Sequence, residues 1–255
     1  GMLVLVGVLT IALSGSALPS VYFAQVEGFR TMQFAPLALA IGLPQLIIAP
    51  LVAALLNLRW VDSRWMLSLG AMLMAASCLM GSQLTSDWSR ENFWMIQIMQ
   101  AFGQPMMIVS VLMSATSVVL PQEGPFASAM FNTVRGFSSV AAGALVERFL
   151  SYRQQFHSHT LLDQAANRPW LMTADSAASA SSSAPLLPDG SISSGENIGH
   201  FATLVRQQSM VLSISDCYLM LIGIATLLVL LTVWLPKRVW PPQTLIQPVT
   251  PTPRT

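Results

Sequence analysis

Charged residues are scarce in this sequence. Lys, Arg, Asp and Glu make up 9% of the 255 residues, whereas 53% are hydrophobic, and the mean hydropathy is +0.60. A soluble domain contains about 25% charged residues, so this composition excludes an ordinary soluble protein and is typical of an integral membrane protein. The formal net charge of +1 provides no basic surface, and we therefore expect no nucleic-acid partner.

Cysteines and catalytic motifs are also scarce. The two cysteines, Cys78 and Cys217, fall in apolar runs, which favours buried thiols over a disulfide framework. The sequence has no Gly-x-Ser-x-Gly, no His-Glu-x-x-His, no phosphate-binding loop and no carboxylate pair inside an apolar run. We therefore expect no enzyme, no cofactor and no metal site. Because the chain begins at Gly1, we expect a piece of a longer protein or an altered start.

Long apolar runs are what the sequence has instead. A helix needs about 20 mostly apolar residues to cross a bilayer, and each of six runs is near or above that length. These runs predict an all-α integral membrane fold with six transmembrane helices. They are Leu3–Phe23, Phe34–Leu58, Trp65–Leu84, Phe93–Leu120, Pro125–Leu150 and Met210–Leu235.

The runs also predict the organisation of the chain. In the long connection between spans five and six, Tyr152–Trp170 is polar enough to extend the fifth helix outward, whereas Thr173–Gly199 is rich in Ser, Ala and Gly and is expected to be disordered. His200–Gln208 reads as an amphipathic lead into the last span. The expected parts are residues 1–150 with spans one to five, 151–209 as a partly disordered extracytoplasmic loop, 210–235 as span six, and 236–255 as a Pro-rich cytoplasmic tail.

Basic residues indicate the orientation. Arg59 and Arg64 lie between the second and third runs, and Lys237 and Arg238 follow the sixth. Cytoplasmic loops of membrane proteins carry an excess of Lys and Arg. We therefore expect both ends of the chain to be cytoplasmic.

The fifth run carries a stripe of polar residues. Ser128, Asn132, Arg135 and Ser139 are spaced i, i+4, i+7 and i+11, so they share one face of a helix. Arg135 lies about ten residues, or roughly 15 Å, inside the run. A guanidinium at that depth costs on the order of 3 kcal/mol if it faces lipid. We therefore expect the stripe to face protein or water.

The fourth run carries three glutamines on one face. Gln97, Gln100 and Gln104 are spaced i, i+3 and i+7, just before Pro105. They would either line a polar path or form hydrogen bonds to other helices, and the sequence leaves both interpretations open. For Gln45, which is alone in the second run, we expect an interhelical hydrogen bond.

Asp216 stands near the expected start of the sixth span. Ser213 precedes it with the spacing of a capping box, and a carboxylate near a helix N-terminus suits the helix dipole. We favour this capping role over a proton or cation role, which stays open. The expected depth of Asp216 differs from that of Arg135 by about two helical turns, which argues against an ion pair between them.

His157 and His159 suggest a metal site at first sight. Two histidines at i and i+2 point apart on a helix, and no cluster of carboxylates or cysteines accompanies them. We therefore favour a solvated loop at this place.

Several of these segments resemble one transporter family. Gln25–Phe29 looks like the outer loop of the fourteen-helix drug:proton antiporters of the major facilitator superfamily, the EmrB/QacA type, and Asn57–Arg64 is similar to their basic cytoplasmic turn. Ser128–Arg135 resembles their penultimate helix. Residues that continue the match are Gln33, Pro44, Arg153, His157 or His159 with Leu161–Leu162, Gln207–Gln208 and Asp216.

This resemblance implies the C-terminal six helices of such a transporter, one half of a major facilitator bundle. The protein would export amphipathic drugs or toxic compounds across the inner membrane in exchange for protons. Its partners would be a small-molecule substrate, protons, the N-terminal half, the lipid bilayer and a periplasmic adaptor protein. In the substrate path, Arg135 would set the electrostatics, and Asn132, Gln97, Gln100 and Gln104 would offer hydrogen bonds.

Two other functions stay open. The first is a transporter of the same fold that exports one specific metabolite or siderophore. The second is a self-contained six-span membrane scaffold or sensor. Neither is excluded by the composition or by the spacing of the polar residues.

Overall fold

The computed structural model describes residues 2–58, 60–116, 124–166 and 194–234. All regular elements within these ranges are helices, as the apolar runs predicted. They are α1 (Met2–Leu13), the 3-10 helix η1 (Ser14–Ala17), α2 (Leu18–Gln25), α3 (Thr31–Leu56), α4 (Ser63–Gly81), α5 (Asn92–Thr116), α6 (Gly124–Ala166) and α8 (Ser194–Val233).

Five helical stretches in the described part of the chain are long and apolar enough to cross a membrane. The helix of the expected fifth span, α6, is not among the five, because Asn132 and Arg135 interrupt its apolar part. Five of the six expected spans therefore correspond to helices of the required length and composition, and the span through α6 stays a prediction. The five stretches are Val4–Gln25, Ala35–Leu56, Ser63–Gly81, Asn92–Ala115 and Ala202–Val233.

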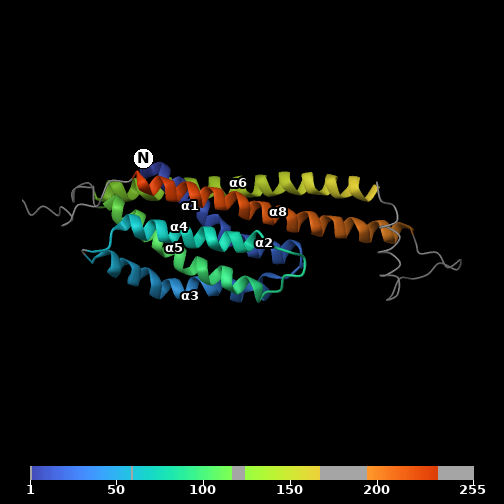
Figure 1. The fold of residues 1–255 in the computed structure, drawn as a ribbon, viewed down its shortest axis with the longest axis horizontal. Coiled ribbons are helices and arrows are strands. Elements are labelled where there is room, and N and C mark those ends of the chain that lie inside the picture. Colours follow the sequence, from blue (N-terminus) through green and yellow to red (C-terminus); the bar gives the residue numbers. More distant parts are fainter. Residues whose placement is uncertain (1, 59, 117–123, 167–193, 235–255) are drawn as a thin grey trace, which may run out of the picture.

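The helices lie side by side, with α3 along one edge and α6 along the other (Figure 1). Helix α4 packs against α5 and α8, and α6 packs against α8 and α1. Helices α6 and α8 continue past the others at one end of the bundle (Figure 1), which we call the projecting end. With 43 and 40 residues, they measure about 65 Å and 60 Å, twice the thickness of a hydrocarbon core.

Because α6 and α8 are so long, much of the expected loop 151–209 is helical. Both ends of this expected loop, 151–166 and 194–209, are helical. The extension of the fifth helix beyond Tyr152 is thus confirmed as far as Ala166, but residues 194–199, expected to be disordered, belong to α8. Residues 173–193 and the tail 236–255 lie outside the described residues.

Three buried clusters of described residues hold the bundle together, the smallest of which joins α3 to α4 and α5 through Ile48, Val52, Leu56, Met66 and Met106. Near the projecting end, Tyr22, Phe23 and Phe93 pack together and contact Tyr218 and Cys217 of α8. Toward the other end, a second cluster joins α1, α4, α5 and α8. Its members include Leu9, Leu67, Met74, Met107 and Leu228. Cys78 and Cys217 are buried free thiols, as the sequence indicated.

Helices α4 and α5 approach each other most closely where two glycines face one another. A Cβ atom on Gly70 would lie 2.9 Å from the carbonyl oxygen of Gly103 and 2.8 Å from Cγ of Met107. A Cβ atom on Gly103 would lie 3.0 Å from the carbonyl oxygen of Gly70. Small residues therefore set this helix spacing, as is common in membrane bundles.

We expect Gly70→Ala to destabilise the protein by about 1–3 kcal/mol, the usual cost of inserting a carbon atom into a packed interior. The carbonyl oxygen of Gly103 belongs to the backbone and cannot move aside. Gly42→Ala is the matched control, because a Cβ atom there meets nothing within 4 Å. Thermal unfolding of the full-length protein in detergent measures both variants, and an unchanged melting temperature for Gly70→Ala would contradict the close crossing.

Candidate functional site

The polar stripe of α6 lies on an open face of the bundle. Ser128, Asn132, Arg135 and Ser139 are all exposed. The neighbouring face of the helix is the packed one, because Phe131 and Val134 contact the second cluster. The hydroxyl of Ser138 approaches Gly7 of α1 on this side. Phe131 and Val134 thus face the bundle, whereas the exposed part of α6 carries both the stripe and large apolar side chains such as Phe137 and Val140.

Arg135 has no hydrogen bond or ion pair with any described residue, and it stands at the level of the second cluster rather than at a helix end. Asp216 is not its partner, in line with the separation in depth that the sequence indicated. Arg135 therefore projects an uncompensated positive charge from the open face of α6.

The three glutamines of α5 are buried, but only one of them has a partner among the described residues. The amide Nε2 of Gln45 on α3 donates to Oε1 of Gln104 at 2.7 Å. The expected interhelical hydrogen bond of Gln45 is therefore confirmed. By contrast, Oε1 of Gln97 and both amide atoms of Gln100 are buried without a partner. The glutamine face is thus partly an interhelical contact and partly free for another ligand.

Asp216 takes part in both ion pairs found among the described residues. Its Oδ2 accepts from Nε of Arg153 at 2.7 Å, and the second guanidinium contact is 2.6 Å. Nε2 of His157 lies 2.6 Å from the same oxygen. Because a carboxylate only accepts, this imidazole nitrogen must carry a proton. One carboxylate on α8 therefore ties together two residues one turn apart on α6.

The expected capping role of Asp216 is wrong. Helix α8 begins at Ser194, so Asp216 lies about six turns inside the helix. The hydroxyl of Ser213 donates to the carbonyl of Ser209, as mid-helix serines do, and makes no cap. The sequence-based interpretation failed because it placed the helix start where hydropathy rises rather than where the chain becomes helical.

The expected solvated loop at His157 and His159 is also wrong. Both residues lie within α6, where His157 is 17% exposed and faces Asp216, and His159 is exposed. The ring of Phe156 packs against the guanidinium of Arg153 and the imidazole of His157. The i, i+4 spacing of Arg153 and His157 was the signal in the sequence that could have revealed this shared face.

The predicted site residues therefore separate into three places. Arg135 and Asn132 lie on the open face of α6, Gln97, Gln100 and Gln104 lie inside the bundle on α5, and Asp216 lies at the projecting end. The hydroxyl of Ser215, next to Asp216, donates to the carbonyl of Ser82 just beyond α4. This contact fixes the level of Asp216 at the end of the bundle.

Comparison with known proteins supports a transporter. No protein-family model matches the chain. The chain is 23% identical over 160 residues to YhcA of Bacillus subtilis (strain 168), named as an uncharacterized MFS-type transporter. The aligned part is 62% of this chain and 30% of YhcA, so the chain spans less than a third of that relative.

The five apolar helices indicate an integral membrane protein, and the similarity to an MFS-type transporter supports a transporter role. Membership of the major facilitator superfamily stays a prediction. The fourteen-helix type and the position in a C-terminal half stay predictions.

We expect the contact between Arg153 and Asp216 to stabilise the packing of α6 on α8. The two side chains are 30% and 20% exposed, so the coupling energy should be about 1 kcal/mol, between that of a surface pair and that of a buried pair. A double-mutant cycle of Arg153→Gln and Asp216→Asn, followed by thermal unfolding of the full-length protein, measures it.

Arg148→Gln serves as the control for this cycle, because Arg148 is exposed on the same helix. It should show no coupling to Asp216→Asn. Strictly additive effects of Arg153→Gln and Asp216→Asn would refute a direct interaction.

Proposed function

We propose that this chain is the C-terminal half of a secondary exporter of the major facilitator superfamily, which expels amphipathic compounds across the inner membrane in exchange for protons. The single observation that carries the proposal is the uncompensated charge of Arg135 on the open face of α6. The resemblance to fourteen-helix antiporters and the similarity to an MFS-type transporter also support an exporter.

The energetics of Arg135 favour a transport path over a lipid contact at the stripe. A guanidinium in hydrocarbon costs on the order of 3 kcal/mol even by insertion scales. The exposed surface of α6 also carries Phe137 and Val140, so that part of it suits lipid, whereas the stripe suits water or protein. The stripe is therefore best explained by a water-filled cavity against a second bundle, where transporters of this kind bind substrates near the midplane.

Within this path, Arg135 would attract and orient the charged part of a substrate, and Asn132 would add a hydrogen bond. The glutamines of α5 would line the path from the interior of the bundle. Asp216 is engaged with Arg153 and His157, so we assign it to holding α6 and α8 together rather than to substrate binding.

A periplasmic adaptor protein would contact the projecting end. Beyond His157, the last α6 residue that contacts Asp216, α6 continues for 9 residues to Ala166, and α8 begins 22 residues before Asp216 at Ser194. These extensions measure about 14 Å and 33 Å. Two helices of this length beyond a bundle provide a surface that a membrane-embedded transporter alone does not need.

A specific observation favours a second candidate, a narrower exporter of one metabolite or siderophore. The charge on the Ser128–Ser139 face is positive, and no carboxylate lies on it. Such a face selects compounds with a negatively charged group. A substrate-panel efflux assay separates this candidate from broad drug export, and the absence of all efflux would favour the scaffold or sensor.

We expect Arg135→Ala to reduce efflux by the full-length protein to background while membrane expression stays near normal, because the side chain is exposed and has no hydrogen bond or ion pair with a described residue. Arg135→Lys should restore only part of the rate, since an ammonium lacks the planar fork of a guanidinium. Accumulation of a fluorescent substrate dye in cells measures the rate, and membrane immunoblots measure expression.

Arg148→Ala is the matched control, because it makes the same change at an exposed arginine further along α6. This variant should transport at the parental rate. Parental transport by Arg135→Ala would remove Arg135 from the path. Loss of expression in Arg135→Ala alone would assign the residue a structural role instead.

We expect the projecting end to be extracytoplasmic, because α8 ends away from it at Val233 (Figure 1) and Lys237 and Arg238 follow α8 in the sequence, while Arg59 and Arg64 come between α3 and α4 or at the start of α4. A topology reporter inserted between residues 173 and 193 should report the extracytoplasmic side, and one placed after Arg238 should report the cytoplasm. Reversed signals from the two fusions would overturn the orientation.

A further inference from the structure

Three tryptophans gather at the end of the bundle opposite the projecting end. Trp60 lies in the turn between α3 and α4, Trp65 lies in the first turn of α4, and Trp234 follows the last residue of α8. The hydroxyls of Ser68 and Thr232 lie 2.8 Å apart, so α4 and α8 meet within about one turn of Trp65 and Trp234. The three tryptophans are 96%, 78% and 88% exposed. We call this set the tryptophan girdle.

Trp65 and Trp234 each end an exposed apolar helix face. On α4, Leu69 and Met72 are exposed and follow Trp65 at i+4 and i+7, so they share its face. On α8, the exposed Leu230 precedes Trp234 by four residues. An indole combines an apolar body with one N–H donor, and tryptophans are enriched where hydrocarbon meets the lipid headgroups. The girdle therefore has the position expected at one surface of a bilayer.

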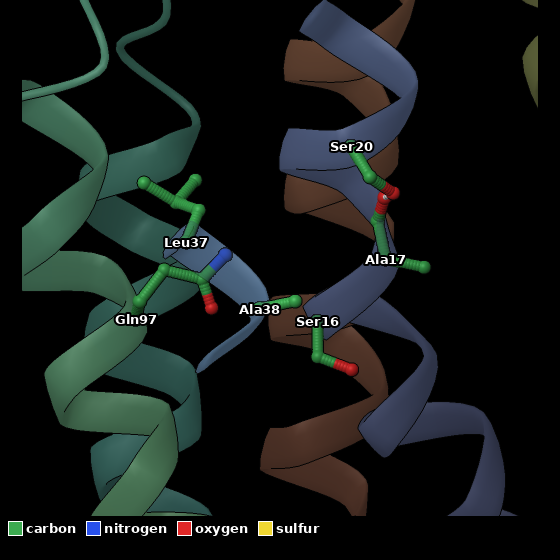
Figure 2. A pocket seen from close by; sticks show the side chains of 6 residues that line it. All are labelled: Ser16, Ala17, Ser20, Leu37, Ala38 and Gln97. Atoms are coloured by element: carbon green, nitrogen blue, oxygen red, sulfur yellow. Dashed lines mark hydrogen bonds between the residues drawn. The ribbon is translucent and has the colours of Figure 1, made fainter. Parts of the chain in front are cut away.

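The exposed surface between the girdle and the opposite end suits acyl chains. Every exposed residue of α3 from Pro36 to Leu55 is apolar or glycine. A pocket of about 240 Å³ opens between α3 and the junction of η1 and α2 (Figure 2), where Ala17 and Ala38 are exposed. The hydroxyls of Ser16 and Ser20 in its wall donate to backbone carbonyls three residues earlier. These serines therefore need no water.

Aromatic residues also lie at the other end of α4. This helix has 19 residues and is about 28 Å long. The turn after it leads to Trp88, which packs against Phe93, and to Trp94, which is 39% exposed. The hydrocarbon core of a bilayer is about 30 Å thick. The two levels of aromatic residues therefore match the two surfaces of one bilayer.

A basic side chain lies within the girdle. Arg64 stands next to Trp65 at the start of α4, is partly exposed, and takes part in neither ion pair of the described residues. The carboxylate of Asp62 accepts from the backbone N–H of Arg64 at 3.4 Å and so caps α4. The guanidinium therefore has no counter-ion among the described residues. Guanidinium groups pair well with phosphate oxygens, because their N–H donors form a planar fork.

We propose that the tryptophan girdle and Arg64 form a binding surface for anionic phospholipids in the leaflet at this end of the bundle. The indoles lie where acyl chains meet headgroups, and Arg64 pairs with a headgroup phosphate. Two more basic residues, Lys237 and Arg238, follow Trp234 in the sequence and match the negative charge of such a leaflet. This binding requires no transport activity.

The test uses the purified full-length protein and two lipids with the same chains, dioleoylphosphatidylglycerol and the zwitterionic dioleoylphosphatidylcholine. Native mass spectrometry after incubation with an equimolar mixture measures how strongly the protein prefers the anionic lipid. We expect the parental protein to prefer phosphatidylglycerol, and Arg64→Gln to lower this preference about fivefold, the factor that corresponds to one basic residue near a membrane surface. Arg64→Lys should keep most of the preference, because it keeps the charge.

Arg206→Gln is the matched control, because Arg206 is exposed on α8 in its projecting part. It should keep the parental preference. Equal retention of both lipids by the parental protein, an unchanged preference in Arg64→Gln, or an equal loss in Arg206→Gln would overturn the lipid surface. Inorganic phosphate at millimolar concentration should not displace phosphatidylglycerol, and displacement would assign Arg64 to a free anion instead.

A second measurement keeps the proposal testable if Arg64→Gln fails to fold. Nitroxide labels at Met72 and at Trp60, introduced one at a time through cysteine, report their depth in vesicles of phosphatidylglycerol and phosphatidylcholine. Both sites are exposed, so the labels disturb little packing. The label at Met72 should be relaxed mainly by oxygen dissolved in lipid, and the label at Trp60 by a water-soluble nickel complex. Equal access of the nickel complex to both labels would contradict the level of the girdle.

Discussion

The high cost of an unpaired polar group in hydrocarbon is the constraint on which this structure depends. Most polar side chains in the described spans avoid this cost, because they form hydrogen bonds to another helix or to the backbone of their own helix. Gln45 bonds Gln104 between α3 and α5, and Ser68 of α4 lies 2.8 Å from Thr232 of α8. Without an apolar driving force between helices in lipid, such contacts and close packing at small residues hold the bundle together. Exceptions to the rule are therefore informative.

Two exceptions point to function. Arg135 stands on an open helix face without a partner in the described part of the chain, and buried amide atoms of Gln97 and Gln100 have no partner there either. The first is an exposed positive charge, and the others are buried neutral groups. Asp216, in contrast, is paired with Arg153 and His157.

The contact of Asp216 with α6 stabilises the pair of long helices at the projecting end. Helices α6 and α8 run far past the bundle (Figure 1), so they lose the apolar neighbours that hold their other parts. The carboxylate of Asp216 joins them at the level where the support by α4 ends, since Ser215 bonds the carbonyl of Ser82 at the same height. One polar contact there prevents the two long helices from separating where packing becomes thin.

The sequence by itself determined the membrane class, five of the spans, the burial of both cysteines and the alignment of the polar stripe on α6, because run length and helical period depend only on local spacing. The partner of Gln45 and the contact of Asp216 with Arg153 and His157 were decided by the tertiary structure alone. Asp216 and Arg153 are 63 positions apart, and hydropathy cannot show which helix faces meet. Hydropathy also ends a span where polar residues begin, whereas backbone hydrogen bonds continue a helix through water. For that reason the start of α8 emerged only from the fold, whereas the sequence already indicated the extension of α6 beyond Tyr152.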